Sequence, residues 1–91
     1  MTMANLYLID RPFADSALGL LKQDGDAEVV LIQDGVYLGN GASLGKAKRV
    51  YAVKRDVERR GLGGFVGKSV QLIDYPELVD ILFANKVLNF A

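Results

Sequence analysis

The sequence of 91 residues contains neither cysteine nor histidine. Without cysteine, the chain cannot form a disulfide, hold a persulfide or use a thiolate as a nucleophile. Without either residue, the usual zinc ligand sets are excluded. General-base chemistry near neutral pH would have to fall to a carboxylate or a lysine with a strongly shifted pKa. We therefore expect no catalytic activity of its own, no metal site and no cofactor.

Signals for export and for membrane insertion are also missing. No apolar run approaches the roughly 18–20 residues that cross a bilayer. The first ten residues, MTMANLYLID, show neither a positively charged segment nor a cleavage site. We expect a cytoplasmic protein with a single domain spanning residues 1–91, because this length leaves no room for a second core.

Strand and helix patterns alternate along the chain. Hydrophobic residues make up 51% of the sequence, enough to fill a core. The pattern predicts strands at 5–10, 28–33, 49–54, 69–74 and 86–90, with helices at 12–21, 55–61 and 75–85, while 34–43 is ambiguous. This order predicts an α/β fold, compact and doubly wound, with a mainly parallel sheet and helices on both faces. A flavodoxin-like strand order fits, although the sequence alone does not fix the order.

A glycine-rich stretch, RGLGGFVGKSV, occupies residues 60–70. It nearly matches the phosphate loop G-x-x-x-x-G-K-[ST], but Leu62 stands where the first glycine is required. A phosphate loop also leaves a strand and enters a helix, whereas this stretch leaves a predicted helix and enters a predicted strand. We therefore reject nucleotide binding here and interpret the stretch as a surface connection.

Charge is unevenly distributed although the formal net charge is zero. Residues 46–60 hold seven basic and two acidic side chains, and residues 1–45 hold two basic and six acidic ones. A basic stretch suits RNA or an acidic partner. The favoured interpretation is a solvated helix with its preceding strand, so direct RNA contact is not our first expectation.

One group of candidate site residues follows the second predicted strand: Gln33, Asp34, Gly35 and Tyr37. Sites in α/β folds lie at the carboxyl ends of parallel strands. One interpretation is that Asp34 caps the next helix while Gly35 permits the turn. The alternative is that this loop forms a subunit contact with Tyr37, because tyrosine is enriched at interface hot spots.

A second group lies at the ends of the first and third predicted strands: Asp10, Arg11, Lys54 and Arg55. A flavodoxin-like order would make these strands neighbours and would create a pocket for an anion. The competing interpretation is that Asp10 caps a helix and the basic residues are solvated. Similarly, the apolar residues near the C-terminus suit core packing or a surface shared between subunits: Phe83, Val87, Leu88 and Phe90.

Three segments carry a resemblance to a known family: YLIDRPF at 7–13, VVLIQDGVYLG at 29–39 and VYAVKRDVERRG at 50–61. Together with IDYPELVDIL at 73–82, they resemble the DsrH/TusB family of small sulfur-relay proteins. The resemblance implies a DsrE-like fold. It also implies assembly with related DsrE/TusD-like and DsrF/TusC-like subunits, which pass persulfide sulfur between cysteines in tRNA 2-thiouridine formation or sulfur oxidation.

Some members of that family carry a cysteine, and this chain has none. What the resemblance implies here is therefore a non-catalytic subunit that positions a cysteine-bearing partner. The alternative is a stand-alone homo-oligomer that binds a small anionic ligand through Arg11, Lys54 and Arg55.

Overall fold

A computed structural model describes residues 5–10, 14–21, 26–40, 47–64 and 70–91. Five strands form one sheet: β1 (Asn5–Ile9), β2 (Glu28–Leu31), β3 (Arg49–Val53), β4 (Val70–Ile73) and β5 (Lys86–Phe90). The helices are α1 (Ala14–Leu21), the 3₁₀ helix η2 (Gln33–Asn40), α2 (Lys54–Arg59) and α3 (Tyr75–Ala84). All strand pairs are parallel. The predicted fold class is thus confirmed.

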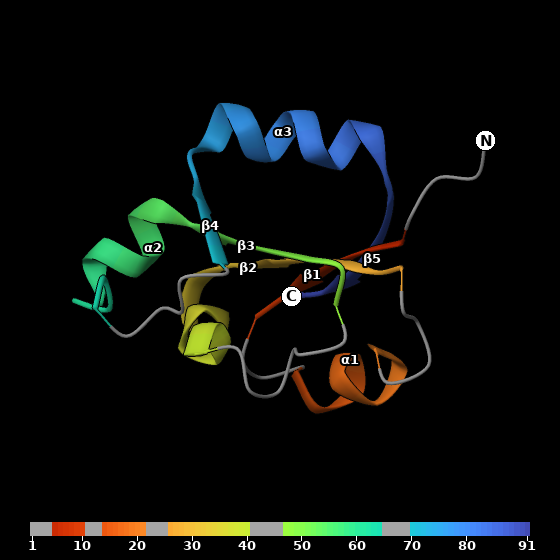
Figure 1. The fold of residues 1–91 in the computed structure, drawn as a ribbon, viewed down its shortest axis with the longest axis horizontal. Helices are drawn as coiled ribbons and strands as arrows, with labels where there is room; N and C mark the ends of the chain where they lie inside the picture. The colour runs from red at the N-terminus through yellow and green to blue at the C-terminus, as the bar shows by residue number, and fades with distance from the viewer. Residues whose placement is uncertain (1–4, 11–13, 22–25, 41–46, 65–69) are drawn as a thin grey trace.

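The strand order is β4-β3-β2-β1-β5, so the expected flavodoxin-like order of 2-1-3-4-5 is wrong. The first four strands are laid down side by side, and α3 then carries the chain back across the sheet to β5. Because parallel crossovers are right-handed, this reversal places α3 on the opposite face from α1 and η2 (Figure 1).

Two apolar clusters fill the space on the two faces of the sheet. On one face, Ala17, Leu21, Val36 and Val57 from the helices pack with strand residues such as Val29. On the other face, α3 supplies Leu78, Ile81 and Leu82 against a second set of strand residues: Leu6, Val30, Tyr51, Val53 and Ile73. Strand β2 contributes to both clusters, as its continuous apolar sequence predicts for a strand covered on both sides.

The apolar residues near the C-terminus divide between core and surface. Phe90 stacks on Tyr7 with ring centroids 5.7 Å apart, and Leu88 packs against the same cluster. Phe83 is 83% exposed and Val87 is 38% exposed. Core packing therefore holds for two of the four residues only.

Helix α3 begins at a well-formed cap. The Asp74 side chain accepts a hydrogen bond from the Glu77 backbone N–H at 3.0 Å, and the Glu77 carboxylate accepts one from the Asp74 N–H at 3.3 Å. This is the capping box, and Pro76 in the first turn suits the missing donor at that position. Among the helices that the structure describes, none is long and apolar enough to cross a membrane.

Candidate functional site

The carboxyl ends of the strands meet at one edge of the sheet. Following the strand order, this edge presents Asp74 after β4, Lys54 after β3, Gln33 beyond β2 and Asp10 after β1. Strand β2 separates β1 from β3, so the predicted adjacency of Asp10 with Lys54 and Arg55 is wrong. Arg11, the fourth member of that predicted group, lies outside the described residues.

A tight turn follows β2. Gln33 has a φ of +48°, the left-handed region that non-glycine residues rarely adopt. The Gly35 N–H donates to the Ile32 carbonyl at 2.8 Å and closes the turn. Gly35 is buried, and a Cβ there would collide with the carbonyl oxygen of Ile9. The prediction that Gly35 permits the turn thus has a physical reason, since only glycine fits so close to the β1 backbone.

Asp56 holds this turn from the neighbouring element. Its Oδ2 accepts a hydrogen bond from the Gln33 backbone N–H at 2.9 Å. Asp56 is 6% exposed, and it is the one buried charged residue within the described part of the chain. A buried carboxylate is tolerated when it is hydrogen-bonded and paired. The sequence predicted only a helix at 55–61 around Asp56, because a contact across 23 residues has no local signal.

Arg60 ties the turn to the end of α2. Its Nε donates to Asp34 Oδ1 at 2.9 Å, and its Nη1 donates to the Asp56 backbone carbonyl at 3.1 Å. The same Nη1 lies 3.7 Å from Asp56 Oδ1. The hydrogen bond to Asp34 is the main cause that raises the pKa of Arg60. A raised pKa means that the guanidinium keeps its proton to a higher pH than usual, so Arg60 stays charged at any physiological pH.

The side chains of Gln33 and Asp34 point outward, and that of Tyr37 is 37% exposed. The structure therefore brings Gln33, Asp34 and Gly35 together with Asp56 and Arg60 into one braced turn. The contact role that the sequence suggested for Gln33, Asp34 and Tyr37 remains a prediction.

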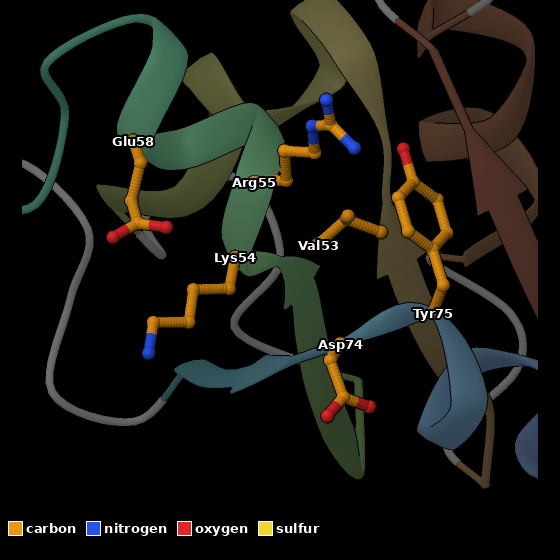
Figure 2. Close-up of a pocket in the computed structure, with 6 residues that line it drawn as sticks. All are labelled: Val53, Lys54, Arg55, Glu58, Asp74 and Tyr75. Carbon is orange, nitrogen blue, oxygen red and sulfur yellow. The ribbon is translucent and has the colours of Figure 1, made fainter.

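A separate pocket of about 310 Å³ lies at the ends of β3 and β4. Its wall combines apolar and charged side chains: Val53, Lys54, Arg55, Glu58, Asp74 and Tyr75. Figure 2 shows Val53 between the side chains of Arg55 and Tyr75. This volume is at the lower end of the range for small-ligand sites. Sequence analysis found Lys54 and Arg55 but missed Asp74 and Tyr75, although the D-x-x-E spacing before an apolar helix signals the cap at Asp74.

The basic stretch at 46–60 does not form one patch in the described residues. Lys48 and Arg49 lie at the amino end of β3, and Lys54 and Arg55 follow its carboxyl end, about 16 Å away at the usual rise of a strand. A hydrogen bond with Tyr51 raises the pKa of Arg49. Splitting the cations between two ends of the sheet weakens the case for a single RNA-binding surface.

No group of three or more carboxylates that could hold a metal ion occurs within the part of the chain that the structure describes. The arrangement thus offers a braced turn, an amphipathic pocket and exposed polar side chains. Such features suit binding and positioning.

An all-parallel five-stranded sheet in this order, with helices on both faces, is the architecture of a DsrE-like α/β protein. The YchN protein from E. coli has this fold, with a TM-score of 0.73 over 99% of this chain and 100% of that one at 19% identity. Protein Tm0979 from Thermotoga maritima superposes with a TM-score of 0.65, covering 87% of this chain and 91% of that one at 32% identity.

The sequence places the chain within this class. Residues 12–87 match the family described as DsrH like protein. Protein TusB from Salmonella arizonae and its counterpart from Salmonella newport are each 43% identical over 79 residues, covering 78% of this chain and 82% of the relative. The chain belongs to the DsrH-like family, which confirms the resemblance inferred from its motifs. Membership assigns it to the sulfur-relay subunits.

Proposed function

We propose that this chain is a non-catalytic subunit of a sulfur-relay complex, where it positions a cysteine-bearing partner. The observation that carries the proposal is membership of the DsrH-like family by a chain with no cysteine. Sulfur transfer between proteins needs a thiolate as nucleophile, and no other side chain replaces it. The persulfide must then reside on other subunits, and DsrE/TusD-like and DsrF/TusC-like chains are the expected partners.

The TusB name of the relatives favours a role in tRNA 2-thiouridine formation over a role in sulfur oxidation. The braced turn supports a positioning role. Gln33 is exposed, has a strained backbone and is held by the buried carboxylate of Asp56, so it offers a rigid contact point that a partner can bind. We assign the partner contact to the loop of Gln33, Asp34 and Tyr37.

Affinity capture of the tagged chain from its native organism tests this function, with mass determination of the intact assembly. We expect co-purification of small cysteine-containing subunits. When these are loaded with labelled sulfur, the label should reside on their cysteines and never on this chain. Loss of tRNA 2-thiouridine on gene deletion would identify the tRNA branch. Recovery of the chain without any such subunit would overturn the proposal.

The variant Gln33→Gly tests the contact loop itself. Glycine accepts the left-handed backbone, so folding stability should be kept or raised while the exposed side chain is lost. We expect weaker capture of the partner. The matched control is Gln71→Gly on the exposed side of β4, which should not weaken capture although glycine lowers strand stability. Equal capture by the Gln33→Gly variant would remove Gln33 from the contact.

A second candidate function is binding of a small anion, and the pocket beside Lys54 and Arg55 favours it. Glu58 and Asp74 in the same wall oppose a simple anion site. Titration with inorganic phosphate, followed by NMR shifts of the amides at 53–58, tests this candidate. Saturable shifts that disappear in Arg55→Ala would support it, and an unchanged spectrum would eliminate phosphate as a ligand.

A further inference from the structure

Helix α3 exposes much of its apolar surface. Of its ten residues, none is buried. Leu78, Ile81 and Leu82 pack partly against the sheet. The remaining large apolar side chains are open to solvent: Tyr75 at 49%, Val79 at 47% and Phe83 at 83% exposure. A helix of a small domain normally turns such residues towards its core.

The three exposed residues form one stripe, since residues four apart in a helix lie on the same face. The acidic residues Glu77 and Asp80 lie about 160° and 100° around the helix from Val79, at the usual 100° per residue. Aromatic side chains bury roughly 150–250 Å² each. Since Phe83 is 83% and Tyr75 49% exposed, the two rings supply about a third of the ≈800 Å² that each side of a stable interface needs.

The stripe is continuous with the pocket, because Tyr75 belongs to both. Phe83 lies at the other end of the stripe, eight residues or about 12 Å along the helix axis. Val79 is midway between the two. The protruding Phe83 side chain and the pocket at Tyr75 thus lie at equal distances from Val79. A contact between identical surfaces requires this arrangement.

We propose that α3 is a two-fold interface between two copies of this chain. The two α3 helices pack antiparallel with Val79 near the axis, and Phe83 of each copy inserts into the pocket beside Tyr75 of the other. Tyr75 and the aliphatic stems of Lys54 and Arg55 would surround the ring, with the buried Val53 beneath it.

Charge complementarity supports a second copy as the occupant. The C-terminal end of a helix carries a partial negative charge, and α3 has no basic residue in its last turn. The antiparallel arrangement brings Lys54 and Arg55 of one copy to that end of the other copy's α3. Nucleic acid does not suit this surface, because the charged residues of α3 and its cap are all acidic: Asp74, Glu77 and Asp80. The contact does not depend on the proposed sulfur-relay function, and it leaves the turn at Gln33 to another partner.

The absence of native cysteine allows a clean cross-linking test. Val79→Cys should form a disulfide-linked homodimer rapidly under mild oxidation, because the two residues meet at the axis. Leu20→Cys, at a 52% exposed apolar position on α1, is the matched control and should cross-link far more slowly. A mixture of Tyr75→Cys and Phe83→Cys chains should give more mixed dimer than either variant gives alone, because the helices are antiparallel.

Sedimentation of the unmodified chain over a dilution series provides the second measurement. We expect a monomer–dimer equilibrium whose dissociation constant rises at least about 30-fold in Phe83→Glu, the loss typical of a hot-spot side chain. Leu20→Glu should leave the dissociation constant of the dimer unchanged. Phe83 is so exposed that its replacement should not unfold the monomer, and circular dichroism checks this. A strictly monomeric chain, or Val79→Cys linking no faster than the control, would overturn the two-fold contact. The two-fold contact would also be overturned if the parent chain did not self-associate and the Phe83→Glu variant instead lost binding of a different subunit.

Discussion

Gly35 is the residue where the smallest addition should matter most. A methyl group there would overlap the Ile9 carbonyl oxygen. This atom belongs to the sheet backbone, so it cannot move aside as a flexible side chain could. We expect Gly35→Ala to lower the free energy of unfolding by about 1–3 kcal/mol, as overpacking does. Gly19→Ala is the control. Apart from the backbone of its own helix, no atom of the described residues lies within 4 Å of its added Cβ, and the change should raise helix stability by about 0.5–1 kcal/mol. Urea denaturation measures both, and a neutral Gly35→Ala would contradict the close approach.

Asp56 should contribute more to stability than its neighbour Asp34. Removing the buried Asp56 carboxylate leaves the backbone N–H of Gln33 without its acceptor in a part-buried hydrogen bond, and such a loss costs about 1–3 kcal/mol. Asp34 is 57% exposed in its salt bridge with Arg60, and exposed pairs contribute about 0–1 kcal/mol. Chemical denaturation of Asp56→Ala and Asp34→Ala should therefore give clearly unequal losses. Equal small losses would mean that the turn does not need its buried brace.

At the scale of single elements, the cap of α3 makes a separate prediction. Asp74→Ala removes the side chain that accepts from the Glu77 N–H, and such caps contribute about 0.5–2 kcal/mol. Asp80→Ala changes an exposed acid within the same helix and should shift the unfolding midpoint little. Thermal unfolding of the two variants distinguishes a cap from a general effect of negative charge. The idea fails if both variants unfold together with the parent chain.

Most elements could be predicted from the sequence because their signals are local. Apolar runs of strand length, Pro76 at a helix start and the turn-forming glycines predict the alternation that the structure confirms. Local signals fail for η2, where glycines within an apolar segment obscured a 3₁₀ helix. They also fail for Val79, whose spacing fits the sheet-facing stripe of α3 although one sheet cannot cover so wide an apolar arc.

At the scale of the whole molecule, strand order depends on contacts between residues distant in sequence. The sequence around Lys86–Phe90 does not predict that this strand pairs with β1 rather than with β4. The wrong strand order then misplaced the candidate site. It joined Lys54 and Arg55 to Asp10, whereas the fold joins them to Asp74 and Tyr75 in one pocket. The motifs after single strands were easier to find, since Gln33, Asp34 and Gly35 adjoin along the chain.

The fold predicts a hierarchy of protection against hydrogen exchange. Strand β2 lies at the centre of the sheet, and Val29, Val30 and Leu31 are fully buried. Their amides should exchange only through global unfolding, whereas α3, with none of its residues buried, should open locally and exchange faster. Exchange measured by mass spectrometry in dilute solution tests this ranking. Raising the protein concentration should slow the amides of α3 and leave those of β2 unchanged, because the two-fold contact covers α3 and the neighbouring pocket but not β2. If the amides of α3 in the dilute monomer exchanged as slowly as those of β2, the helix would be part of the core. The description of its apolar stripe as exposed would then be wrong.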